Sequence, residues 1–152
     1  MKHAAIAVLA LLSLAFATDH ARADAPANKA DAILGEWKTS NGEARVRFAN
    51  EGGSYVGRVT WLKTATKDGK PVLDENNPDS SLKSRQMLGA AIVWNMHFDG
   101  EGTYVDGFLY DPEHGKTYKG KASVDGPNKL TLRGYVGIPL FGRSDSWARH
   151  AP

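Results

Sequence analysis

From residue 33 onward, hydrophobic and polar residues alternate in short segments that are separated by turn signals. In residues 43–49, for example, Ala44, Val46 and Phe48 alternate with charged residues. A period of two is typical of a β-strand with one buried face. An Asn-Gly dipeptide, the strongest short hairpin signal, directly precedes this segment.

Alternation of this kind predicts eight strands, joined mostly by tight turns rich in Gly, Asp and Asn: 33–39, 43–49, 54–62, 90–98, 103–111, 116–124, 129–136 and 143–149. Short strands in a meander favour an all-β, antiparallel, up-and-down barrel, because closure removes the exposed edges. Eight strands enclose room for side chains or for one small ligand. A two-sheet sandwich is the alternative.

Residues 63–89 form one long connection in the predicted meander. A connection of this length without structure is uncommon in a compact domain. Asp79 or Ser80 can cap a short helix that runs through Leu88. We therefore expect one short helix within residues 77–88.

The first 23 residues have the pattern of a signal peptide. Lys2 precedes an apolar run over residues 6–17, and Ala-Arg-Ala at 21–23 fits the small-x-small cleavage rule. The run is shorter than the ~20 residues of a membrane-spanning helix. We expect cleavage near Ala23/Asp24, a periplasmic or secreted protein, a flexible leader over 24–32 and a single domain over 33–150, with an uncleaved anchor as the alternative.

Composition and charge argue against several classes of function. The chain has no cysteine, so disulfides cannot stabilise it. Its formal net charge is +2, and its basic residues are scattered along the sequence, so no concentrated basic face for nucleic-acid binding is predicted. The histidines lack a metal-ligand spacing, and no nucleophile motif is present. We expect neither metal nor cofactor and lean against an enzyme, although carboxylates and tyrosines distant in sequence could converge.

Several segments resemble known families. "LGEW" at 34–37 and "GRSDSWAR" at 142–149 resemble the ends of a lipocalin-type barrel, in which a Gly-x-Trp packs under a late arginine. The resemblance implies structural roles for these residues: Gly35, Trp37, Trp147, and Arg149 or Arg143. Four longer segments, at 57–62, 74–89, 110–118 and 132–147, resemble an exported bacterial family named domain of unknown function 2147. This implies a lipocalin-like barrel and assigns no biochemical role.

Arg133 and Tyr135 are the first candidate ligand-binding residues. They lie two apart on a strand and so point to the same face. A guanidinium inside the barrel would need an anion or dense hydrogen bonding, and fatty-acid-binding barrels, which this fold resembles, hold a carboxylate with an Arg-x-Tyr pair. The alternative is an exposed Arg133 beside a half-buried Tyr135.

The remaining candidates have open alternatives. Tyr110 and Tyr118 either flank a turn as cross-strand aromatics or lean into a cavity. Trp94 shares its predicted strand face with Ile92, Met96 and Phe98, which favours core over a ligand site, and Arg58 points either in or out.

The segment 137–142 lies between Arg133 and Arg143 and contains Ile138, Leu140 and Phe141. We expect these residues to fold inward and close the barrel end. The alternative is a mouth that contacts a lipid, a membrane or a partner, because an exposed apolar patch of this size needs an explanation.

The sequence thus predicts a periplasmic lipocalin-like protein that binds a small amphipathic or apolar ligand, with Arg133 and Tyr135 as polar anchors and residues 77–88 as a lid. The alternative is a non-enzymatic envelope interaction protein, whose barrel is filled by side chains and whose partner surface is the 137–142 loop.

Overall fold

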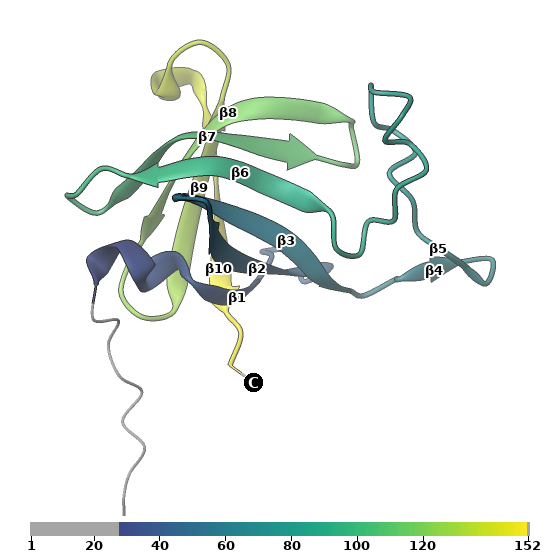
Figure 1. Ribbon diagram of the computed structural model, residues 1–152, viewed down its shortest axis with the longest axis horizontal. Coiled ribbons are helices and arrows are strands. Elements are labelled where there is room, and N and C mark those ends of the chain that lie inside the picture. The colour runs from purple at the N-terminus through teal and green to yellow at the C-terminus, as the bar shows by residue number, and fades with distance from the viewer. Residues whose placement is uncertain (1–27, 152) are drawn as a thin grey trace, which may run out of the picture.

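In the computed structural model, the described residues, 28–151, form a closed antiparallel barrel (Figure 1). Its eight strands are β1 (Gly35–Lys38), β2 (Ala44–Glu51), β3 (Ser54–Leu62), β6 (Ala91–Phe98), β7 (Thr103–Asp111), β8 (Lys116–Val124), β9 (Lys129–Tyr135) and β10 (Arg143–Arg149). Each strand pairs with its neighbour in sequence, and β1 pairs with β10 to close the sheet. The predicted all-β barrel is confirmed. The predicted signal peptide lies outside the described residues.

The long connection, residues 63–89, does not contain the predicted helix. It forms a two-stranded hairpin of β4 (Thr66–Lys67) and β5 (Lys70–Pro71), then a series of turns and a bridge between Leu73 and Gln86. The backbone N–H of Asp74 donates to the Arg85 carbonyl, so this stretch pairs with itself across the connection. That pairing takes the Arg85 carbonyl away from a continuous helical hydrogen-bond ladder.

One barrel end is closed by η1, a 3₁₀-helix over Lys29–Ile33. Ile33 is fully buried, and its backbone N–H donates to the Tyr104 hydroxyl at 3.1 Å. Residues 29–32 of the expected flexible leader are part of this short helix. The same end carries the turns β2–β3, β6–β7 and β8–β9, since consecutive strands run antiparallel.

Large side chains fill much of the barrel interior, and glycines on neighbouring strands make room for them. A Cβ at Gly107 would collide with Met96, and one at Gly120 would lie 2.6 Å from Leu109 Cγ. Trp37, Val46, Met96 and Leu130 are all fully buried. Alternation of small and large residues is how small barrels are packed.

Trp94 does not share a face with Met96 as the sequence pattern predicts. Asn95 has a positive φ of 57°, which interrupts the alternation of β6. Val93 and Met96, three residues apart, are both buried, whereas Trp94 is half-buried. The irregularity thus leaves Trp94 outside the packed interior.

The opposite barrel end is the open rim. It carries the turn β1–β2, the long connection, the turn β7–β8 and the loop β9–β10, which includes η2 (Pro139–Phe141). Segments far apart in sequence therefore meet at one rim, and the candidate sites lie there.

Candidate functional site

A cleft of about 370 Å³ lies on the rim, between the long connection and the barrel wall. One side is formed by Asn77, Pro78, Asp79, Leu82 and Arg85, and the other by Ala91, Trp94, Tyr110 and Thr117 of β6, β7 and β8. We call this hollow the cleft. Its volume is within the range of small-molecule sites, which begins at roughly 300 Å³.

The cleft is held open by a buried polar network around Asp74, whose exposed fraction is 1 %. One carboxylate oxygen accepts a hydrogen bond of 2.6 Å from the Tyr110 hydroxyl. The other accepts from Asn77 Nδ2 at 2.7 Å and from Arg85 Nε at 2.8 Å. Because Tyr110 belongs to β7 and the other three to the long connection, this network joins the connection to the barrel wall.

Arg85 reinforces the same junction. Its guanidinium lies 5.6 Å from the centre of the Tyr110 ring, an arrangement in which the ring face attracts the cation. Burial, together with the hydrogen bond to Asp74 and its negative charge, raises the pKa of Tyr110 to about 12. Tyr110 therefore stays protonated and keeps donating to Asp74 far above neutral pH.

A second attachment joins the long connection to the β7–β8 turn. Asn76 Nδ2 donates to the carbonyl oxygens of Pro112 and Glu113, at 3.3 and 2.9 Å. Gly115 has a positive φ of 62°, and a Cβ there would collide with the Asn76 carbonyl oxygen. Only glycine combines this backbone conformation with so close an approach.

The walls of the cleft differ in chemistry. Trp94 lies half-exposed and stacks on Phe108 with ring centres 5.8 Å apart, so its orientation is fixed. Leu82, with 36 % of its surface exposed, is the large hydrophobic residue of the opposite wall. Arg85, Asp79 and Thr117 supply hydrogen-bonding groups. The cleft thus offers an apolar surface beside polar groups.

A smaller hollow of about 140 Å³ opens into the barrel interior. Apolar side chains of Val93, Leu109, Leu132 and Trp147 line its depth, while Arg143 and Asp145 are exposed at its entrance. Asp145 accepts a 2.8 Å hydrogen bond from Trp147 Nε1. This volume is below that of drug-sized ligand sites.

Arg133 does not point into the barrel. Leu130 and Leu132 are buried in the core, and Arg133 alternates with them on the outer face of β9. Its three guanidinium nitrogens donate to Pro139 O at 2.7 Å, Ser144 Oγ at 3.0 Å and Leu140 O at 3.1 Å. Of the two positions that the sequence leaves open, Arg133 therefore takes the outer one, beside a half-buried Tyr135, and it fixes the β9–β10 loop.

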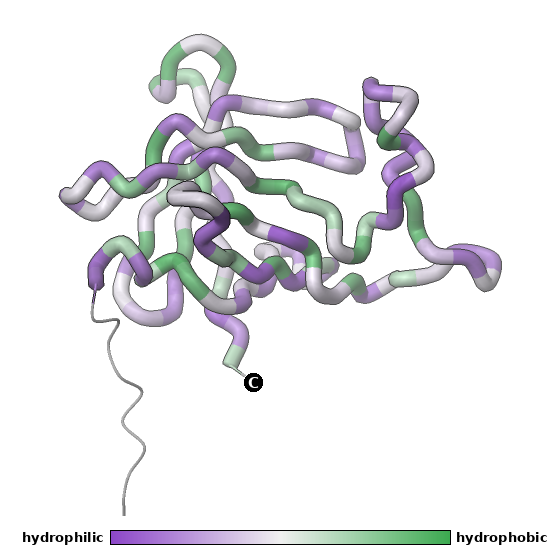
Figure 2. The backbone as a smooth tube through the Cα atoms, in the orientation of Figure 1, coloured by the Kyte–Doolittle hydropathy of each residue, from purple (hydrophilic) through white to green (hydrophobic). Residues whose placement is uncertain are grey.

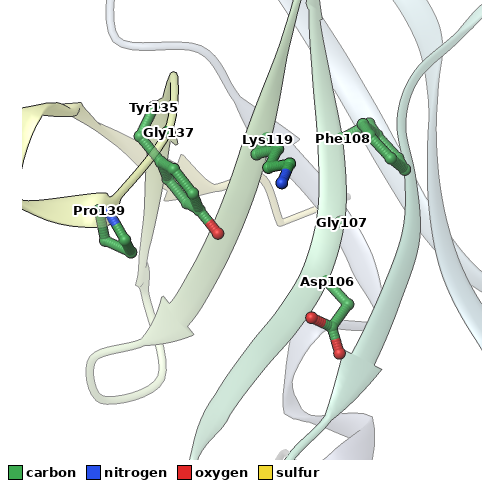
Figure 3. Close-up of a pocket in the computed structure, with 7 residues that line it drawn as sticks. All are labelled: Asp106, Gly107, Phe108, Lys119, Tyr135, Gly137 and Pro139. Carbon is green, nitrogen blue, oxygen red and sulfur yellow. The ribbon is translucent and has the colours of Figure 1, made fainter.

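Tyr135 lies on the same outer face and lines a hollow of about 290 Å³ beneath that loop. Figure 3 shows the Tyr135 and Lys119 side chains between Pro139 on the loop and Phe108 on β7. Asp106, Gly107 and Gly137 complete its lining. We call this the outer hollow.

The β9–β10 loop does not fold inward, so the expected closure of the barrel end is wrong. Val136, Ile138, Leu140 and Phe141 have exposed fractions of 74, 52, 75 and 78 %. Figure 2 shows hydrophobic residues on this loop, at the top of the view. The bonds from Arg133 to the loop carbonyls account for this position, because they hold the loop against the outer face of the barrel.

Two other sequence candidates lie away from the cleft. Arg58 points outward and forms a bidentate ion pair with Glu51, with both N–O distances 2.9 Å. Tyr118 pairs with Leu109, and Tyr110 pairs with Thr117, so the two tyrosines are not cross-strand partners.

Arg149, and not Arg143, packs on the first tryptophan. Its guanidinium carbon lies 4.0 Å from the centre of the Trp37 ring. It also donates to the carbonyl oxygens of Ala32, Leu34 and Pro127 at 2.6–2.8 Å. A Cβ at Gly35 would lie 3.0 Å from this guanidinium, so the glycine makes room for it. Burial lowers the pKa of Arg149.

Sequence reasoning missed Asp74, Asn77, Leu82 and Arg85 as site residues. The sequence places them in the long connection, part of which is the expected short helix, and no spacing among them matches a known motif. The only available signal was an excess of polar residues in a connection too long for a simple turn. Their convergence on Tyr110 depends on tertiary structure.

Comparison with known proteins identifies the family of this chain. The sequence profile of the family described as "Uncharacterized protein conserved in bacteria (DUF2147)" matches residues 35–149. The chain belongs to this family. The match covers the barrel from β1 to the end of β10 and confirms the resemblance seen in the sequence.

Solved structures show the fold class. The chain is similar to HP1028 from Helicobacter pylori, described as belonging to the lipocalin family, with a TM-score of 0.69 and 20 % identity over 78 % of this chain and 83 % of that one. It is also similar to two redesigned beta barrels, one bound to DFHBI, at 12 % identity and TM-scores of 0.43 and 0.40, over 82 and 80 % of this chain and 96 and 98 % of theirs. The similarity to HP1028 shows that the fold is lipocalin-like. No curated protein sequence matches the chain.

Residues 28–151 contain neither a cluster of metal-ligand side chains nor a membrane-spanning helix. No group of three or more His, Cys, Asp or Glu side chains in that range is placed to hold a metal ion. None of the helices there has the length and hydrophobicity needed to cross a membrane.

Proposed function

We propose that this protein is an exported lipocalin-like carrier that binds a small amphipathic molecule in the cleft between the long connection and β6–β8. The observation that supports this most directly is the cleft itself, about 370 Å³ in volume and held open by the buried Asp74 network. A preformed concave site with an apolar wall and a few placed polar groups is the usual form of a small-molecule site.

The walls indicate what kind of molecule fits. A flat or branched apolar part packs between Trp94 and Leu82, because both are partly exposed and face the same space. A hydrogen-bonding end lies near Arg85, Asp79 and Thr117. Arg85 is already paired with Asp74, so a neutral polar end fits better than a strongly anionic one.

Export is supported by the sequence of residues 1–23, with its basic start, apolar run and small-x-small end. The absence of cysteine is compatible with an oxidising compartment, because the barrel is stabilised by its core and by Arg149 without disulfides.

Native mass spectrometry of protein purified from its own envelope, followed by denaturing extraction, tests the proposal. We expect a copurifying small amphipathic molecule that is lost in Trp94→Ser and kept in Trp61→Ser. Trp61, on β3, is also half-buried, but it lies under Arg45 of β2 and outside the cleft. An apo mass in every preparation, with no binding across a panel of small amphipathic molecules, would contradict the carrier function.

A second candidate is favoured by a different observation, the exposed β9–β10 loop. A loop that presents Val136, Ile138, Leu140 and Phe141 to solvent, beside a well-filled barrel, fits an envelope interaction protein. Loss of a cellular partner in Leu140→Ser, with ligand binding unchanged, would support it. Both candidates can hold together, because the loop does not line the cleft.

A further inference from the structure

We propose that the β9–β10 loop docks on a lipid bilayer that contains anionic lipids, with its apolar residues inserted among the lipids and the lysines of β8 against the headgroups. This inference rests on the second candidate function, an interaction surface at the loop, and names what that surface contacts. It does not depend on a ligand in the cleft.

The loop has the composition of a membrane-inserting segment. Four of the six residues 136–141 are large, apolar and more than half exposed. Within residues 28–151, the other exposed large hydrophobic residues are Leu82 and Leu88, both on the long connection. Exposed apolar surface is thus concentrated on one projecting loop (Figure 1), a shape that suits insertion into a deformable bilayer.

Arg133 holds this apolar loop away from the core. Its guanidinium donates hydrogen bonds to the carbonyl oxygens of Pro139 and Leu140. The apolar side chains of the loop are exposed to solvent. Gly137, with a positive φ of 78°, and Pro139, at the start of η2, fix the backbone further. An apolar loop that is held in an exposed conformation loses little conformational entropy when it inserts.

The strands beside the loop carry positive charge on the same outer face. Lys119 pairs in register with Tyr135, and Lys121 pairs with Arg133. None of these three cations forms an ion pair with another residue of the described chain. Asp106 also lines the outer hollow with Lys119, so the hollow holds one carboxylate beside the ammonium group. Lysines near a membrane surface are attracted to anionic headgroups.

The same charges argue against a second copy of this chain as the occupant. A two-fold interface places the same patch on both subunits. Two copies that met loop to loop would therefore bring Lys119 and Lys121 toward their own equivalents, which is repulsive. A bilayer with anionic headgroups and an apolar interior matches both the lysines and the loop.

Sedimentation with sucrose-loaded vesicles tests the inference. The purified protein is mixed with vesicles of phosphatidylcholine alone, or of phosphatidylcholine with phosphatidylglycerol, at low and at high salt. We expect binding to the anionic vesicles that weakens with salt, and much weaker binding to the neutral ones. The Leu140→Ser/Phe141→Ser double variant should bind at least about tenfold more weakly.

Matched controls separate the loop and the lysines from general effects. Leu88→Ser removes an exposed leucine from the long connection, 48 % exposed, and should leave vesicle binding within about twofold. Lys119→Gln/Lys121→Gln should weaken binding to anionic vesicles by about fivefold or more. Lys67→Gln/Lys70→Gln on the exposed β4–β5 hairpin should not.

Any of three other outcomes would contradict the bilayer inference. If the wild-type protein does not sediment with anionic vesicles, the bilayer inference is overturned. If instead it self-associates and the loop double variant is monomeric by analytical ultracentrifugation, the loop is an interface between copies, and the second candidate function stands without the bilayer. If neither vesicle binding nor self-association depends on the loop, the inference falls. The carrier proposal is judged separately, by Trp94→Ser.

Discussion

The hydroxyl of Tyr110 on β7 donates a 2.6 Å hydrogen bond to Asp74, which is 36 residues earlier in the chain. Asp74 has an exposed fraction of 1 % and is held on its other oxygen by Asn77 and Arg85. This pair therefore joins the long connection to the barrel wall, and the cleft depends on it.

Removal of this hydrogen bond should loosen the cleft. In Tyr110→Phe, a buried carboxylate oxygen of Asp74 loses its partner, so we expect the free energy of unfolding to fall by about 1–3 kcal/mol. Ligand affinity should fall as well. Urea denaturation measures the first effect. Tyr118→Phe, on a half-buried tyrosine of the neighbouring strand, is the control and should change stability by less than about 0.5 kcal/mol. Equal losses in the two variants would mean that the Asp74 contact contributes nothing special.

Stability should fall at alkaline pH. Burial and the neighbouring Asp74 raise the pKa of Tyr110 to about 12, and burial raises that of Tyr104 to about 12. An unfolded tyrosine has a pKa of about 10, so the unfolded chain releases these protons first. The stabilising contribution is complete below about pH 10 and is lost as the pH rises through about 12. Urea unfolding as a function of pH measures this slope, and Tyr110→Phe should reduce it. If the wild-type protein and Tyr110→Phe show the same slope, Tyr110 does not cause the alkaline loss of stability.

The attachment at Gly115 should be sensitive to a single methyl group. In Gly115→Ala the new Cβ meets the Asn76 carbonyl, so the long connection must shift and the cleft must change shape. Gly52→Ala is a matched control, because Gly52 has a similar φ of 65° and nothing within 4 Å of the added Cβ. Backbone strain of about 1–2 kcal/mol affects both variants. We expect Gly115→Ala to lose more stability than Gly52→Ala. Hydrogen exchange in residues 74–88 should become faster only in Gly115→Ala. Matching exchange in both variants would rule out a tight contact there.

The two late arginines should differ in their contribution to stability. Arg149→Leu removes three hydrogen bonds to backbone carbonyls and the contact with Trp37, and we expect a loss of roughly 2–4 kcal/mol. Arg143→Leu changes an exposed side chain at the rim and should stay within about 0.5 kcal/mol. Thermal unfolding of the two variants makes the comparison. A larger loss in Arg143→Leu would reverse the assignment.

The strands could be predicted from sequence because each signal is local. Alternation in residues 43–49 and an Asn-Gly turn before them depend on neighbouring residues alone, and the eight segments match the eight barrel strands closely. Alternation failed in β6, where Asn95 with positive φ shifts the faces and leaves Trp94 outside the packed interior.

The site could be predicted only in part, because its parts are joined by tertiary contacts. Tyr110 and Trp94 were candidates, but their partners on the long connection were not, since the pairing of Asp74 with Tyr110 has no sequence spacing to indicate it. Two positions of Arg133 are open from the sequence, an anchor inside the barrel, by analogy with an Arg-x-Tyr pair, and an exposed residue. Leu130 and Leu132 occupy the core, so strand alternation places Arg133 outside.

The proposed carrier binds a small amphipathic molecule in the cleft and not in the barrel interior. The decisive measurement is chemical-shift mapping by NMR, with the molecule extracted from the native protein. We expect the largest chemical-shift changes at the Trp94 indole, the Leu82 methyl groups and the Arg85 side chain, with small changes at Trp147 and Leu132. Large changes at Trp147 and Leu132, with the Trp94 and Leu82 signals unmoved, would place the ligand inside the barrel and rule out binding in the cleft.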